Sequence, residues 1–144
     1  MRISARTRYA LRVLIELGIH QKAGLTVTTT EIATRQRIPR KFLEQILLLL
    51  RRANIVRSTR GPHGGYKLLP DVTKLSVRTV VELTETTLFN PRDDEEVPIG
   101  VDAIIDVIWQ ETGDLVRDKL ESYSIQDIIH QYQDAQNNPP SYSI

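Results

Sequence analysis

Residues 38–66 decide the fold, and they read IPRKFLEQILLLLRRANIVRSTRGPHGGY. Pro39 suits the first position of a helix, which predicts a helix from Arg40 to Ala53. The apolar residues of this helix recur at helical spacing and are expected to face inward: Phe42, Leu43, Ile46, Leu47 and Leu50. Two β-prone runs follow at 55–59 and 66–69, and the glycine-rich stretch between them predicts a hairpin.

The residues before this segment predict two further helices. Apolar residues at spacings of three and four indicate an amphipathic helix over 7–21. The hydroxyl run that begins at Thr28 and leads to Glu31 is typical of a capped helix start, and this short helix should run to about residue 37. Three helices followed by a hairpin is the order of a winged helix-turn-helix fold. We therefore expect a mainly α fold with a small β-hairpin wing, in which 1–72 form the winged domain.

The rest of the chain, residues 73–144, has the pattern of three helices and a loop. Ser76 is expected to cap a short helix, and a last helix is predicted over 125–136. Between them, a long apolar stripe predicts a helix over 101–122. The acidic, proline-containing segment 90–100 shows no periodicity and is interpreted as an exposed loop. We therefore assign this half of the chain to dimerisation and effector helices around an acidic loop.

The charge of the chain is divided between its two halves. Residues 1–70 carry 14 Lys and Arg against three acids, a balance of +11, whereas residues 71–144 carry 5 against 15, a balance of −10. The overall charge of +1 hides this division. Because a basic surface attracts polyanions, the first half is predicted to bind double-stranded DNA.

The helix predicted from residue 40 would enter the major groove in a winged fold. Its exposed side chains are expected to read base edges through Arg40, Lys41, Glu44 and Gln45, and to contact phosphates through Arg51 and Arg52. Exposed cations on a helix are also common on an ordinary solvated face. It is their concentration in one helix that favours a DNA contact.

The tip of the predicted wing combines Arg60 with three glycines. Glycines let the backbone approach DNA closely, here at Gly64, while one guanidinium could enter a narrow minor groove. His63 could meet a phosphate. A glycine-rich tip is also typical of an ordinary hairpin turn, and this one lacks the lysine of a nucleotide-binding loop. The three preceding helices favour a wing.

The long helix predicted over 101–122 carries an apolar stripe that we interpret as a dimer interface. The stripe consists of Val101, Ile104, Ile105, Ile108, Trp109, Leu115 and Val116. An aromatic residue on such a stripe usually belongs to a core. A small winged domain has little surface with which to cover a helix of this length, so the stripe is expected to pack against a second copy.

Several functional classes are excluded by composition. The chain has no cysteine, which rules out disulfides, thiol catalysis and thiolate metal sites. It also has no nucleophile elbow and no paired histidines and carboxylates at metal spacing, so we do not expect an enzyme. The acids at 93–96 lack the alternate spacing and turn glycine of a calcium loop, which favours a solvated loop over a metal site.

No apolar run approaches the roughly 20 residues that a membrane span requires. The N-terminal residues also lack the charged, apolar and small-residue zones of a signal peptide. We therefore expect a cytoplasmic protein with no membrane partner.

Three segments together resemble a known family. They are Met1-Arg2-Ile3-Ser4 with Arg8-Tyr9-Ala10-Leu11, Ile38-Pro39 through Phe42-Leu43-Glu44-Gln45-Ile46, and Arg60-Gly61-Pro62-His63-Gly64-Gly65-Tyr66. In this order and spacing they closely resemble the bacterial winged helix-turn-helix transcription regulators of the IscR, NsrR and CymR type. The resemblance implies a homodimer that binds a palindromic promoter site, with a long C-terminal helix swapped or crossed between the subunits. We therefore expect a promoter-binding regulator that acts as a repressor.

The resemblance also assigns roles by position. Glu44 and its neighbours match the base-reading helix of the family, and Arg60 matches its minor-groove arginine. Arg2, Tyr9 and Thr28 complete the residues that we expect to contact DNA.

The chain departs from this family where many members hold an iron–sulfur cluster. The resemblance implies three cysteine ligands within about 89–109, and this chain has none. Asp106 stands where one family pattern places a histidine, three residues before Trp109. Because such clusters are bound mainly by thiolates, we expect a cysteine-free member without a cofactor.

An alternative function also stays open. The chain could be an interaction regulator that is controlled by a metabolic enzyme docked on its acidic C-terminal half.

Overall fold

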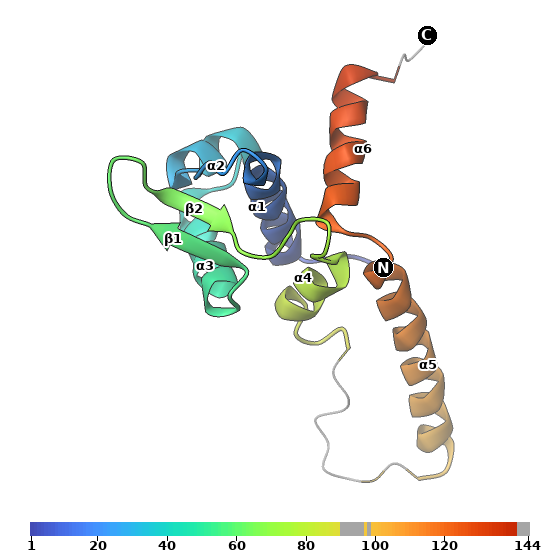
Figure 1. Cartoon of the computed structure of the whole chain (residues 1–144). Coiled ribbons are helices and arrows are strands. Elements are labelled where there is room, and N and C mark those ends of the chain that lie inside the picture. The colour runs from blue at the N-terminus through green and yellow to red at the C-terminus, as the bar shows by residue number, and fades with distance from the viewer. Residues whose placement is uncertain (90–96, 98, 141–144) are drawn as a thin grey trace.

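The computed structural model describes residues 1–89, 97 and 99–140, and within them six helices accompany one two-stranded antiparallel sheet. The elements are α1 (Ala5–Gln21), α2 (Thr29–Gln36), α3 (Arg40–Arg52), β1 (Val56–Thr59), β2 (Gly65–Leu68), α4 (Val77–Thr84), α5 (Val101–Glu121) and α6 (Ile125–Asn137). Helices α1 to α3 lie together with the hairpin at their outer edge, whereas α5 extends away from them (Figure 1). The predicted winged helix-turn-helix architecture is confirmed. No helix in the described part of the chain is long and apolar enough to cross a membrane.

A single apolar core joins the first three helices and the hairpin. Leu14 of α1, Ile32 of α2 and Leu50 of α3 are each fully buried, and Val56 and Leu68 close the core at the base of the wing. Fully burying such a side chain contributes about 1.5–3 kcal/mol, so these contacts fix the position of α3. The spacing of three and four that predicted the helices is the spacing of their buried faces.

The last helix, α6, returns to pack on α1. Its residues Ile125 and Ile129 are buried in the same core. Gly18 of α1 allows the two helices to approach, because a Cβ at this position would lie only 2.7 Å from Cδ1 of Ile129. The core of the winged half therefore includes residues from the far end of the chain.

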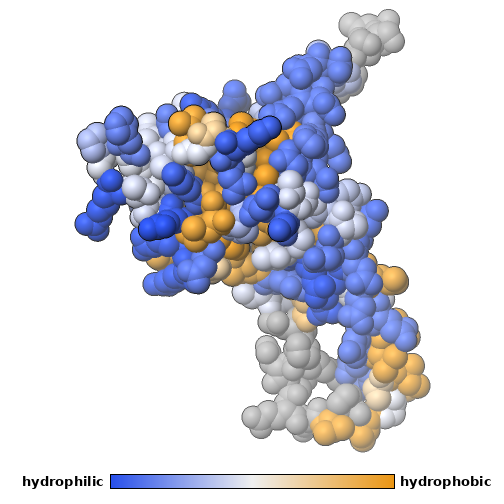
Figure 2. Space-filling view, viewed as in Figure 1, coloured by the Kyte–Doolittle hydropathy of each residue, from blue (hydrophilic) through white to orange (hydrophobic). Residues whose placement is uncertain are grey.

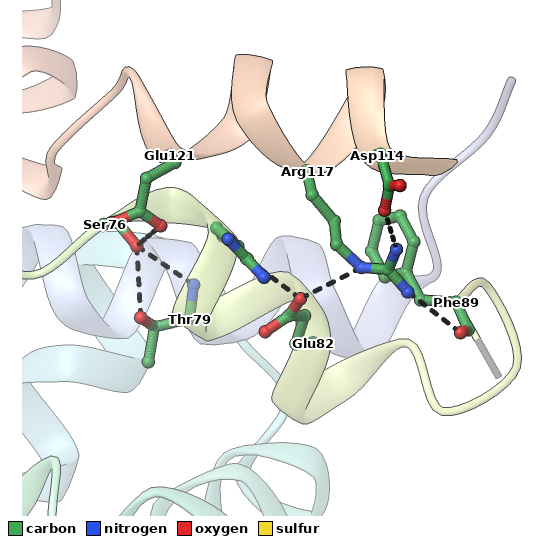
Figure 3. Close-up of polar contacts among 8 residues, drawn as sticks. Ser76, Thr79, Glu82, Phe89, Asp114, Arg117 and Glu121 are labelled. Carbon is green, nitrogen blue, oxygen red and sulfur yellow. Dashed lines mark hydrogen bonds and ion pairs between the residues drawn. The ribbon is translucent and has the colours of Figure 1, made fainter. Parts of the chain in front are cut away.

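Helix α5 is attached to α4 by polar contacts (Figure 3). The Arg117 guanidinium places Nε 3.5 Å from Oε1 of Glu82, and its NH1 donates to Oδ1 of Asp114 at 2.8 Å. Its NH2 donates to the Phe89 carbonyl at 3.1 Å, and its central carbon lies 4.7 Å from the centroid of the Phe89 ring. One arginine thus joins α5 to both α4 and the residues that follow it, although no residue of α5 is buried.

The prediction was wrong for one core residue. Phe42 was predicted to face inward, but its side chain is 47% exposed and its ring centroid lies 5.9 Å from that of Tyr9. Phe42 lies at the edge of the apolar face of α3, where the start of α1 leaves a hollow instead of filling it. The second strand begins and ends one residue earlier than predicted, so that Leu69 lies beyond it and is half-exposed.

Candidate nucleic-acid interface

Helices α2 and α3 form the helix-turn-helix unit, and local hydrogen bonds set its turn. The Thr28 hydroxyl accepts the backbone N–H of Glu31 at 3.2 Å, and the Glu31 carboxylate accepts the Thr28 N–H at 2.8 Å. The Thr28 N–H, as the largest cause, holds the pKa of Glu31 below its ordinary value. Helix α2 ends at Arg37, which adopts the left-handed conformation at φ 51°, and the buried Ile38 then leads into α3.

The buried carboxylate of Glu16 connects α1 to α2. Glu16 of α1 is only 6% exposed, and its Oε1 accepts a hydrogen bond from Nε2 of Gln36 at 2.9 Å. Its Oε2 lies 3.6 Å from NH1 of Arg35 and 4.0 Å from Nδ1 of His20. Because a buried carboxylate requires such partners, these contacts fix α2 relative to α1.

The outer face of α3 carries every base-reading and phosphate-binding residue that the sequence predicted on this helix. The side chains of Arg40, Lys41, Glu44, Gln45, Arg51 and Arg52 are all exposed. Arg40 donates from NH1 to the Thr30 hydroxyl at 3.2 Å, and its Nε lies 3.9 Å from Oε1 of Glu44. The first turn therefore presents donors and acceptors side by side, as base readout requires.

The wing is fixed to the helix-turn-helix unit by backbone pairing. Val27 and Tyr66 exchange two backbone hydrogen bonds of 3.0 and 2.8 Å, and the Thr26 hydroxyl donates to the His63 carbonyl at 2.8 Å. Gly65 is required here, because it has φ 148° and a Cβ would lie 2.7 Å from the Val27 carbonyl oxygen. These bonds hold the wing against the residues that lead into α2, while β1 contacts α3. Sequence reasoning missed Thr26, since a single loop hydroxyl carries no pattern.

The tip of the wing presents Arg60 and His63, two of its predicted DNA contacts, to solvent. Arg60 and His63 are exposed, and the Arg60 guanidinium forms no ion pair or hydrogen bond with any residue that the structure describes. The Gly64 N–H donates to the Gly61 carbonyl at 2.9 Å, and a Cβ on Gly64 would lie 2.6 Å from the Thr59 carbonyl oxygen. The tight tip thus leaves one guanidinium free to reach outward.

The start of α1 adds further cations beside α3. Arg2 and Tyr9, which were expected to contact DNA, line a hollow of about 480 Å³ together with Arg8 and Arg12. The Arg12 guanidinium lies 5.7 Å from the centroid of the Tyr9 ring. Arg8 and Arg12 were missed from the sequence, although their spacing of four places them on one face of the helix.

The apolar stripe of α5 is exposed along most of its length. Val101, Ile104, Leu115 and Trp109 are each more than 60% exposed, and only Val116 of the predicted interface residues is half-buried. Ile105 and Ile108 are 43% and 49% exposed. Figure 2 shows hydrophobic side chains gathered along the far part of α5, away from the winged half. A stripe of this kind marks an interaction surface.

The donor groups of this chain do not fit an iron–sulfur cluster. The chain has no cysteine, and the described residues contain no group of three or more histidines and acids that could hold a metal ion. The acids at 93–96, considered above as oxygen ligands, lie outside the described residues.

Comparison with known proteins gives consistent findings. A family model described as "Rrf2: Iron-dependent Transcriptional regulator" matches residues 3–131. Protein rrf2 of Nitratidesulfovibrio vulgaris is 32% identical over 133 residues, which cover 90% of this chain and 87% of that protein. The HTH-type transcriptional regulator IscR of Cereibacter sphaeroides is 39% identical over 89 residues, which span 61% of this chain and 57% of that regulator.

A solved structure has the same fold. CymR (YrzC), the global cysteine regulator of B. subtilis, matches with a TM-score of 0.74 at 24% identity, over 91% of this chain and 98% of that one.

Proposed function

Because this chain belongs to the Rrf2 family of helix-turn-helix transcription regulators, and is not an enzyme, we propose that it represses transcription as a homodimer bound to a palindromic promoter site. In this proposal α3 enters the major groove, and Arg60 at the tip of the wing enters the adjacent minor groove.

The observation that carries this proposal is the connection of α3 and the wing through the start of α2. The pair of hydrogen bonds between Val27 and Tyr66 holds the wing beside the start of α2, and Arg40 in the first turn of α3 donates to the Thr30 hydroxyl of α2. The cations on both elements are exposed, and the half of the chain that contains them has a balance of +11. Such a unit can contact two grooves at once without a conformational adjustment.

The homodimer follows from the exposed stripe of α5. Two copies of this stripe would cover each other around a two-fold axis, since an isologous interface uses the same patch twice. A pair of winged halves related in this way matches two half-sites of opposite direction, which is why we propose a palindromic site.

We also propose that the protein acts without an iron–sulfur cluster, in the cytoplasm. The absence of cysteine from the chain supports this, because a carboxylate such as Asp106 does not replace three thiolates. An absorption band between roughly 300 and 500 nm in anaerobically purified protein would contradict the proposal.

A protein partner on the acidic half is the second candidate. Exposed acids recur along α5 and α6, at Asp102, Glu111, Asp114, Asp118, Glu121 and Asp134. Charge reversal of Asp118 and Glu121 should abolish capture of such a partner and leave DNA binding intact.

The main test measures affinity for promoter DNA recovered by genome-wide binding of the purified protein. Arg60→Ala should weaken binding about tenfold, and affinity should fall steeply with salt. Lys74→Ala removes an exposed cation beyond the wing and serves as the matched control, with an expected change of twofold or less. Unchanged binding by Arg60→Ala, together with a flat salt dependence, would refute the proposed function.

A further inference from the structure

A second hollow, of about 720 Å³, lies between the start of α1, one flank of α3 and the residues that follow α4. We call it the α1/α3 hollow. Its walls include Phe42, Leu48 and Leu49 of α3, Tyr9 of α1 and Thr87 after α4. This volume falls within the roughly 300–1,000 Å³ of pockets that hold small molecules.

The apolar wall of the α1/α3 hollow is not explained by the core or by DNA contact. Phe42 and Leu48 are 47% and 38% exposed, although they lie on a helix whose outer face is otherwise polar. Neither residue belongs to the buried core of the winged half, and the ring of Phe42 lies beside that of Tyr9 at the edge of this core. Exposed apolar side chains that line one concave surface indicate a binding site.

The rim of the hollow is cationic. Arg6 and Arg52 both line it, and the Arg52 guanidinium forms no ion pair or hydrogen bond with any residue in the described ranges. Glu85 is the one carboxylate among the lining residues, and its Oε1 already accepts the Ser4 N–H and the Thr7 hydroxyl, each at 2.6 Å. Arg6 also interacts electrostatically with the Glu85 carboxylate. An incoming anion therefore meets the guanidinium of Arg52 directly and shares that of Arg6 with Glu85.

We propose that the α1/α3 hollow binds a small amphipathic carboxylate, with its apolar or aromatic part against Phe42 and Leu49 and its carboxylate on Arg6 and Arg52. A guanidinium pairs with a carboxylate through two parallel hydrogen bonds, which gives both strength and orientation. The apolar wall supplies the remaining affinity.

Occupation of the hollow would act on DNA binding, and this second step rests on the proposed function. Gln45 and Arg52 line the hollow and also belong to the outer face of α3 that we assign to DNA. A bound carboxylate engages the guanidinium of Arg52 that would otherwise contact a phosphate. The ligand therefore weakens promoter binding and lowers its salt dependence by about one ion per subunit.

The direct test is calorimetric titration of the full chain, without DNA, with 4-phenylbutyrate and its neutral counterpart 4-phenylbutanamide to roughly 10 mM. The acid should bind about tenfold more tightly than the amide, because only the acid forms charge-assisted hydrogen bonds. Binding of neither compound, or equal binding of both, would overturn the proposal.

Two variants locate the binding. Arg6→Gln should reduce binding of the acid to the level of the amide, while Lys22→Gln, an exposed cation at the other end of α1, should bind the acid as the unaltered protein does. Leu49→Trp should fill the hollow and abolish binding of both compounds. Where circular dichroism shows that Leu49→Trp is misfolded, the exposed Arg6→Gln still decides the result, and unchanged affinity in Arg6→Gln refutes the site.

A second copy of the chain is the competing occupant. If the acid binds only to a monomeric variant such as Ile108→Asp, the hollow belongs to the dimer interface and the proposal is wrong. If the acid binds to the unaltered protein but leaves promoter affinity unchanged, the regulatory step is wrong. Because the titration contains no DNA, failure of the proposed promoter function would not affect its result.

Discussion

Apolar side chains are buried in the winged half of the molecule but exposed on α5. On α3, Leu43 and Leu50 are fully buried by the same chain, whereas on α5 the larger Trp109 is 73% exposed and no residue is buried. The winged half therefore has a buried core, which Ile125 and Ile129 of α6 complete. Helix α5 carries an apolar stripe that no described part of the chain covers, which is why we propose that a second copy packs against it.

The largest difference in stability is expected between two identical substitutions, one of a leucine in the winged half and one of a leucine on α5. Leu50→Ala removes a fully buried side chain of α3 and should lower the free energy of unfolding by about 2–5 kcal/mol. Leu115→Ala, on the exposed stripe, should change the stability of the dissociated protomer by less than about 0.5 kcal/mol. Urea unfolding at low protein concentration measures both, and equal losses would break the comparison.

A charge on the stripe should separate association from folding. Ile108→Asp places a carboxylate in the proposed interface and should raise the dissociation constant of the dimer at least about 100-fold, because the buried charge has no partner. The winged half should keep its circular dichroism spectrum. Gln110→Asp, an exposed position of α5 outside the stripe, is the control. Sedimentation that shows an unchanged dimer for Ile108→Asp would contradict the assignment of α5.

In the winged half, Thr26→Val tests whether a hydrogen bond that anchors the wing, and not only a buried core, matters for DNA binding. This near-isosteric change removes the hydroxyl that donates to the His63 carbonyl at 2.8 Å. The loss of one such bond, about 1 kcal/mol, should weaken promoter binding about fivefold through the position of the wing. Thr73→Val removes a hydroxyl that donates to Asp71 and to no other residue in the described part of the chain, and this variant should bind normally. If fluorescence anisotropy gives both variants the same affinity for promoter DNA, the hydrogen bond from Thr26 to the tip of the wing does not contribute to DNA binding.

The smallest effect concerns Glu85, which joins the end of α4 to the start of α1. Hydrogen bonds from Thr7, as the largest cause, and from the Ser4 N–H lower the pKa of Glu85 below its ordinary value of 4.5. A lowered pKa in the folded state stabilises the protein above pH 4.5, and this contribution is lost as the pH falls through the folded value. Glu85→Gln should therefore be less stable than the unaltered chain near neutral pH.

The difference in thermal stability between the two proteins should narrow below about pH 4.5. If the difference in thermal stability is the same from neutral to acid pH, the Glu85 carboxylate does not stabilise the contact between the end of α4 and the start of α1.

Periodicity predicted the helices well because most of their buried faces are formed by residues close in sequence. It placed Leu43 and Leu50 inside α3 for this reason. It was wrong for Phe42, because a pattern of apolar residues does not record where the neighbouring helix ends. The wall of the α1/α3 hollow could therefore not be found from the sequence.

Long-range polar contacts were equally invisible in the sequence. The Thr7 hydroxyl bonds to that of Thr84 at 2.7 Å across 77 positions, and neither residue belongs to a motif. By contrast, the wing was predictable, because glycines at a tight tip and pairing of β-prone runs are local signals. The DNA-contacting residues chosen on α3 lie on its outer face, but which of them touch bases stays a prediction.

The length of α5 has a consequence for the DNA. Its 21 residues span about 32 Å at a rise of roughly 1.5 Å per residue, which is close to the approximately 34 Å of one turn of the double helix. In the proposed dimer, the length of the paired α5 helices determines the distance between the two winged halves. A promoter with half a turn inserted between its half-sites would present the second groove on the wrong side of the duplex, whatever its base sequence.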